Sequence, residues 1–203
     1  YRKAAQQGHA DAQFNLGVIF KNGDGVAKGE ASAAEWYTKA AEQGDADAQH
    51  NLGYMYQNGV GVAKDEASAV EWYRKAAEQG HAEAQCNMGA MYLYGFGVPK
   101  NETCAAEWYR RGAEQGDAEA QCSLGLMYEY GNGVAADEVC AAVWYKKAAE
   151  KGQAEGQYSL AAMYSTGNGV PKDEAYALEL YRKAADQGHT DAQFFLSNLD
   201  ISE

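Results

Sequence analysis

Small and apolar residues recur with helical spacing along the chain. Between residues 45 and 56 they occupy positions 46, 48, 52, 53, 55 and 56, which lie on one side of a helix and do not alternate as in a strand. Gly44 suits the end of a preceding helix, and Asp45 suits the N-cap of a new one. The pattern predicts a helix over about 46–57, called helix A below.

A second helix follows after a loop with two glycines, Gly59 and Gly61, which permit positive φ and end helix A. The run from Lys64 to Glu66 then opens helix B at about 66–79, and Gly80 ends it. The same signals predict helix A at 10–21, 82–93, 118–129, 154–165 and 190–200, and helix B at 30–43, 102–115, 138–151 and 174–187.

This helix pair repeats every 36 residues, as a recurring tyrosine shows at Tyr1, Tyr37, Tyr73, Tyr109, Tyr145 and Tyr181. A constant period of this length predicts an all-α solenoid of helix-turn-helix units. We expect one repeat array over 1–203. It starts with the end of a helix B (1–8), continues through full repeats at about 9–44, 45–80, 81–116, 117–152 and 153–188, and closes with a C-terminal capping helix at 189–203.

Three repeated residue types have an expected structural role. Tryptophan, at 36, 72, 108 and 144, is expected to supply the largest apolar burial of each unit. Glycine, at 17, 53, 89 and 125, is expected where two helices approach closely. Glutamine, at 13, 49, 85, 121, 157 and 193, is expected to bond a neighbouring backbone or the adjacent repeat.

Composition narrows the class of protein. Hydrophobic residues make up 46% of the chain but form no run of 18 or more, so no membrane insertion is expected. A net charge of −12 disfavours nucleic acid and anionic membrane surfaces. No signal peptide is visible, and the chain opens inside a repeat, so we expect a fragment of a longer protein whose compartment is undetermined.

The four cysteines, Cys86, Cys104, Cys122 and Cys140, are 18 residues apart. In an antiparallel helix pair that turns near Val98, Cys86 and Cys104 would lie several helical turns from each other, too far for a disulfide. We therefore expect free thiols.

No chemistry-bearing motif predicts an enzyme, a cofactor or a metal. The Gly-x-Gly loops follow helices and are expected to be turns, and no nucleophile signature is present. His9, His81 and His189 are expected to be exposed, cap-like residues. His50 shares its repeat position with Cys86 and Cys122, and helices of successive repeats lie too far apart for these three to hold one ion.

The residues resemble a known family. Ala48-Gln49, Leu52-Gly53, Tyr56, Gly59-x-Gly61-Val62 and Trp72-Tyr73-x-Lys75-Ala76-Ala77 are similar to the Sel1-like repeat, a relative of the tetratricopeptide repeat. The resemblance covers essentially the whole chain. It implies a right-handed α-solenoid that acts as an adaptor in multiprotein assemblies.

The variable face of helix A is the candidate binding surface. The resemblance places helix A on the concave side. Acidic residues beside tyrosines on this face suit a protein or peptide partner with basic and apolar side chains. The expected contact residues are Asp47, His50, Tyr54, Asn58, Glu83, Cys86, Leu93, Tyr94, Glu119, Leu126, Tyr130 and Tyr158. Two interpretations of Asp47, Glu83 and Glu119 stay open: these acidic residues recognise a basic partner, or they only cap helices.

Two alternative functions also stay open. The cysteine-rich branch of the family is credited with binding penicillin-like compounds, which suggests a small-molecule-binding protein or hydrolase, but this chain lacks that branch's cysteine pairs. The array could also be a structural oligomerisation segment. The sequence leaves the oligomeric state undetermined.

Overall fold

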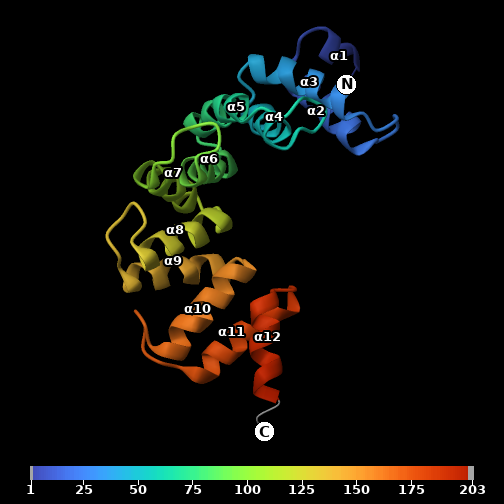
Figure 1. Cartoon of the computed structure of the whole chain (residues 1–203). Coiled ribbons are helices and arrows are strands. Elements are labelled where there is room, and N and C mark those ends of the chain that lie inside the picture. Colours follow the sequence, from blue (N-terminus) through green and yellow to red (C-terminus); the bar gives the residue numbers. More distant parts are fainter. Residues whose placement is uncertain (1, 201–203) are drawn as a thin grey trace. The chain divides into compact units, whose positions relative to one another are not determined.

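The computed structural model describes residues 2–200, except the side chain of Asp200, so Tyr1 and positions 201–203 of the expected capping helix lie outside the described residues. All regular structure in the described part is helical (Figure 1). The A helices are α2 Ala10–Asn22, α4 Ala46–Asn58, α6 Ala82–Tyr94, α8 Ala118–Tyr130, α10 Ala154–Thr166 and α12 Thr190–Asp200. The B helices are α1 Arg2–Gln6, α3 Glu30–Glu42, α5 Glu66–Glu78, α7 Glu102–Glu114, α9 Glu138–Glu150 and α11 Glu174–Asp186.

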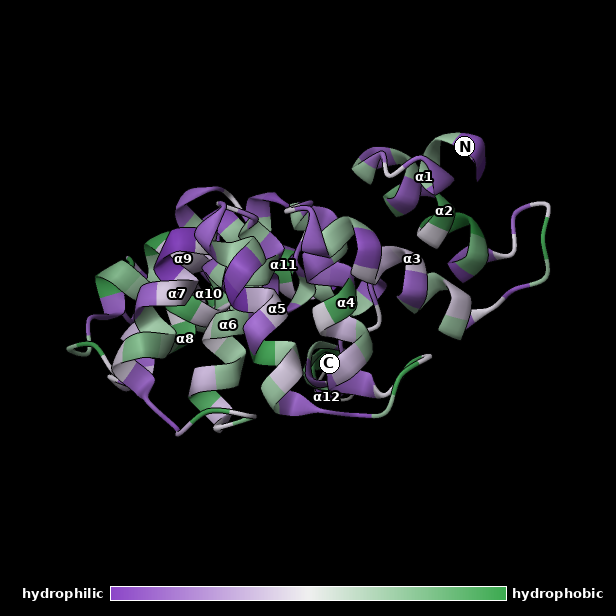
Figure 2. Cartoon of the chain, turned by 90° about the horizontal axis from the view of Figure 1, so that it is seen from above, coloured by the Kyte–Doolittle hydropathy of each residue, from purple (hydrophilic) through white to green (hydrophobic). Residues whose placement is uncertain are grey.

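The chain forms two compact units, residues 1–101 and 102–203. Within each unit every helix packs on the next one along the chain. The expected all-α fold with a helix pair every 36 residues is confirmed, and the full-length helices agree with their expected bounds to within one residue. Each helix carries hydrophobic and hydrophilic residues, as Figure 2 shows, because only part of its surface faces its neighbours.

Capping residues and glycines near the helix ends explain why the helix bounds could be predicted to within one residue. Asp45 accepts a hydrogen bond from the Ala48 backbone nitrogen at 2.8 Å, and Asp65 caps α5 by accepting from Ala67 and Ser68. Gly59 ends α4 in the left-handed region at φ 68°. Side-chain caps and left-handed glycines act within a few residues, so the boundaries follow from the sequence.

The largest fully buried side chain in the repeat is the tyrosine and not the tryptophan. Tyr73 has no exposed surface, whereas Trp72 is half-buried. The Trp72 side chain packs against the core cluster of α3 and α4, and Lys75 Nζ lies 3.9 Å from the centroid of its ring. The tyrosine is therefore the fully buried aromatic residue of the repeat, whereas the tryptophan, expected to supply the largest apolar burial, keeps part of its surface exposed. Gly53 leaves the space that Tyr73 needs, since an added Cβ would lie 2.6 Å from the ring.

The repeated glutamine makes the expected contacts. The Gln49 amide nitrogen donates to the Ala41 carbonyl at 3.0 Å, and its oxygen accepts from Gln79 at 2.7 Å. Equivalent side-chain pairs join Gln43 to Gln13 and Gln187 to Gln157. These bonds link successive helix pairs and satisfy a buried amide.

One glutamine lacks this partner. Gln121 Oε1 is buried without a hydrogen-bond partner, because the donor position holds Lys151, whose Nζ donates instead to the Gly116 carbonyl at 2.5 Å. Lys151→Gln is expected to raise the free energy of unfolding by about 1 kcal/mol, since a buried acceptor gains its donor. Urea denaturation measures this. Lys146→Gln removes an exposed lysine from α9, the helix that Lys151 follows, as a control, and an equal gain there would assign the effect to charge alone.

Candidate functional site

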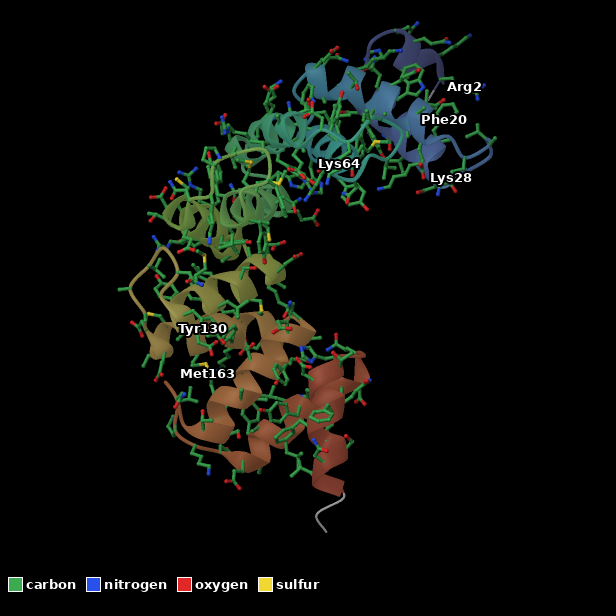
Figure 3. All side chains as sticks on the ribbon, in the orientation of Figure 1. Arg2, Phe20, Lys28, Lys64, Tyr130 and Met163 are labelled. Atoms are coloured by element: carbon green, nitrogen blue, oxygen red, sulfur yellow. The ribbon has the colours of Figure 1, made fainter. Side chains whose placement is uncertain are left out.

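The A helices expose large aromatic side chains. Tyr54 is 47% exposed in the first unit, as is Tyr94 at 63%. Tyr130 is 66% exposed at the end of α8 in the second unit (Figure 3). Tyr94 also contacts Phe96, with ring centroids 5.6 Å apart. Exposed tyrosines of this kind suit recognition, because they offer contact area and a hydroxyl.

The predicted contact residues divide into three classes by burial. The exposed ones are Asp47, Tyr54, Asn58, Glu83, Tyr94, Glu119 and Tyr130. The half-buried ones are His50, Leu93, Leu126 and Tyr158. The only buried one is Cys86.

The prediction that Cys86 lies on the binding surface is wrong, because its side chain is only 6% exposed and cannot form part of a free surface. Residues at this position of the repeat contact the following repeat. At that position His50 stacks on His81, and Tyr158 stacks on His189, so the residue faces the start of the next A helix. A short thiol in this place is enclosed.

A polar cluster surrounds His50 and His81 in the first unit. The two imidazole rings stack with centroids 4.6 Å apart, and the Asn87 amide nitrogen lies 3.0 Å from His50 Nε2. Asp47 Oδ1 lies 3.2 Å from His81 Nε2, and Glu83 Oε2 lies 3.8 Å from His50 Nδ1. Burial, with the neighbouring His81, lowers the pKa of His50 to about 4, so this imidazole is neutral at pH 7.

The second unit contains a related arrangement. His189 Nε2 lies 2.9 Å from Glu155 Oε2, and the His189 ring stacks on Tyr158 at 4.5 Å. His81 and His189 both cap their helices, through hydrogen bonds from the Ala84 and Ala192 backbone nitrogens to Nδ1. The cap-like role is confirmed for these two histidines, but neither side chain is exposed as expected, because each packs on an aromatic ring of the preceding repeat.

The cluster brings His50, His81 and Glu83 together, with one ligand atom of each within 4.8 Å of the others. A four-coordinate zinc site holds its ligand atoms about 3.4 Å apart. His81 Nδ1 accepts the cap bond of α6, and its Nε2 lies 3.2 Å from Asp47 Oδ1, so both ring nitrogens have partners within the protein. The arrangement therefore suits hydrogen bonding between repeats better than metal coordination.

Sequence reasoning missed this pair because it compared equivalent positions, whereas His50 meets the capping position of the next helix A. It also missed Phe96 and the exposed Val139 and Val143 of α9. A signal existed for Val143, since the equivalent positions in other repeats hold Glu35, Glu71 and further glutamates.

The Gly-x-Gly loops are turns, and their second glycine also contacts the preceding repeat. An added Cβ at Gly61 would overlap the Glu30 carbonyl and lie 2.8 Å from the Ala31 nitrogen. Gly97, Gly133 and Gly169 make the same close approach to the start of a preceding B helix. This contact is between backbones and leaves no room for a phosphate.

Comparison with protein families decides the identity of the array. The Sel1 repeat matches residues 1–9, 10–45, 46–81, 82–117, 118–153 and 154–189. The chain belongs to the Sel1 repeat family. No curated protein sequence matches it significantly.

Solved structures place this Sel1 repeat chain among bacterial relatives. It is 43% identical to c5321, a protective antigen of uropathogenic Escherichia coli, with a TM-score of 0.91 over 98% of this chain and 42% of that one. A Sel1 repeat protein from Oxalobacter formigenes is 44% identical, with a TM-score of 0.89 over 95% and 77%. The immunity protein Pa5087 of Pseudomonas aeruginosa is 29% identical, with a TM-score of 0.60 over 93% and 69%. None of these three is named as an enzyme.

The Sel1 repeat solenoid is therefore shown, and this chain spans less than half the length of the E. coli antigen. In the described part of the chain, no disulfide joins Cys86, Cys104, Cys122 or Cys140, as the spacing predicts. Among the described residues, no helix is both long and apolar enough to cross a bilayer.

Proposed function

We propose that this Sel1 repeat chain is a non-enzymatic interaction module that binds a protein or peptide segment on the exposed face of its A helices. The observation that carries the proposal is the exposure of Tyr54, Tyr94 and Tyr130 at positions where the repeats differ. The residues that repeat, such as Ala48, Leu52 and Tyr73, are buried. Shared positions thus hold the helix pairs together, and variable positions are free for recognition.

The charge of the face favours a partner with basic as well as apolar side chains. Asp47 and Glu83 lie beside histidines, yet their side chains stay 67% and 68% exposed. Neither caps its helix, since the cap positions of α4 and α6 are Asp45 and His81. Their carboxylates are accessible to lysine or arginine of a partner. The names of the P. aeruginosa relatives, immunity proteins, favour a protein partner as well.

The experiment is cross-linking in the native cell followed by binding measurements with the purified captured protein. Tyr54→Ala, Tyr94→Ala and Tyr130→Ala are each expected to weaken binding by about tenfold or more, as truncation of an aromatic anchor does. Circular dichroism should not change, because all three side chains are exposed. Val143→Ala, an exposed apolar truncation on α9, is the control. Undiminished binding by the triple tyrosine variant would contradict the proposed face.

A further inference from the structure

The buried tyrosine of helix B has a hydrogen-bond acceptor in two repeats but not in the first. Tyr73 Oη donates to Gln57 Oε1 at 2.7 Å, and Tyr145 Oη donates to Glu129 Oε2 at 2.5 Å. Tyr37 is equally buried, yet its hydroxyl has no partner. The position of Gln57 and Glu129 is held here by Lys21, which has donors and no acceptor.

A cavity of about 480 Å³ lies beside this tyrosine, within the first unit. That volume suits a small ligand or a side chain of a partner. Its polar lining holds the ammonium groups of Lys21 and Lys28, the amides of Asn22 and Asn51, and one carboxylate, that of Glu30.

The charge in the cavity is locally positive, although the whole chain carries −12. Lys28, in the loop before α3 (Figure 3), lies 3.7 Å from Glu30, so its charge is partly balanced. Lys21 forms no ion pair with a described residue, and its Nζ lies 6.0 Å from the centroid of the Tyr54 ring. One ammonium therefore stays available to an anion.

We propose that this cavity binds a carboxylate, whose oxygen takes the place in the first repeat that Gln57 Oε1 and Glu129 Oε2 occupy in their own repeats. Glu129 is itself a carboxylate on the equivalent tyrosine, so the position accommodates this group. Lys21 adds a charge-assisted hydrogen bond, and the ring of Tyr54 covers an adjoining apolar part of the ligand.

The Tyr37 hydroxyl is enclosed in this structure, so a carboxylate reaches it after an exposed side chain, Lys21 or Tyr54, rotates. The site shares Tyr54 with the proposed interface but does not rest on it. Three sources carry the same chemistry: an Asp or Glu side chain of a partner, a free peptide C-terminus, and a small carboxylic acid.

Lys21→Gln is the deciding variant, because it gives Tyr37 an internal acceptor like Gln57 and removes the ammonium. Lys64→Gln makes the same charge change outside the cavity. Titrations followed by NMR use succinate, a peptide with one Glu and blocked ends, and the same peptide with Gln and a free C-terminus. Wild type and Lys64→Gln are expected to bind at least one probe, which identifies the source, and Lys21→Gln to bind it at least about tenfold more weakly.

Two results would overturn the proposal: no probe shifts the resonances of cavity residues at millimolar concentration, or Lys21→Gln binds as tightly as wild type. A stability measurement tests the premise separately. Tyr37→Phe is expected to weaken binding and to leave the urea midpoint at or above that of wild type, because the lost hydroxyl has no partner. Tyr73→Phe is expected to lower the midpoint. An equal fall of the urea midpoint in the two variants would show that the Tyr37 hydroxyl already has a hydrogen-bond partner.

Discussion

Alanine at Gly61 is expected to lower the free energy of unfolding of the first unit by about 3 kcal/mol, whereas alanine at Gly25 is expected to cost about 1 kcal/mol. Both glycines have φ of 70°, so both substitutions force an L-residue into the left-handed region. Only at Gly61 would the new Cβ also overlap backbone atoms of Glu30, whereas nothing lies within 4 Å at Gly25.

Urea denaturation followed by circular dichroism measures the difference between these two variants. Backbone atoms of a helix cannot rotate away as a flexible side chain can, so the overlap at Gly61 must separate the loop from α3. That contact joins two successive repeats, and loss of an interface between neighbours weakens a solenoid as a whole. Equal losses of unfolding free energy at Gly25 and Gly61 would mean that the positive φ alone, and not the close approach to α3, accounts for the effect of replacing Gly61.

Tyr73→Ala is expected to cost about 4 kcal/mol, because it removes a fully buried aromatic side chain and leaves a cavity between α4 and α5. Trp72→Ala is expected to cost about 1–2 kcal/mol, since the indole is half-buried and its contact with Lys75 is at the surface. Truncation of the larger residue, Trp72, is thus expected to cost less stability than truncation of Tyr73.

The same denaturation experiment ranks the two variants. Tyr73→Phe separates the hydroxyl from the ring: it removes only the hydrogen bond to Gln57, worth about 1 kcal/mol. A lower midpoint for Trp72→Ala than for Tyr73→Ala would show that contacts between repeats outweigh burial within one.

The helices were predictable because their signals are local. Asp65 caps the nitrogens two and three residues after it, and Gly59 ends the helix it follows. The 36-residue period then carries each local assignment along the chain. Even the glutamine contacts could be expected, because a polar residue on a packing face requires a buried partner.

The expected C-terminal cap stays a prediction. Ser197, which stands where four earlier repeats hold glycine, indicates a polar end, but α12 leaves Phe194 and Leu199 exposed, with Phe194 at 68%. Polarity counted over a helix does not show which side chains lie outward. That depends on how α12 packs on α11.

The candidate site was less predictable than the fold. The tyrosines on the variable face of helix A could be named from the sequence, and the structure leaves Tyr54, Tyr94 and Tyr130 exposed. The sequence also predicts Cys86 on this variable face, yet its side chain is buried. A helical wheel represents one helix, whereas burial at that position depends on the start of the next A helix.

The family, the helix pair, its period and its boundaries follow from the amino-acid sequence, because they depend on residues close together in the chain. The packing of the helices was needed to show that His50 meets His81, that Gly61 meets the start of α3, and that the buried Tyr37 hydroxyl lacks the acceptor that Tyr73 and Tyr145 have. These pairings depend on how far each helix pair is shifted along its neighbour, and that shift is set by the packing of whole helices.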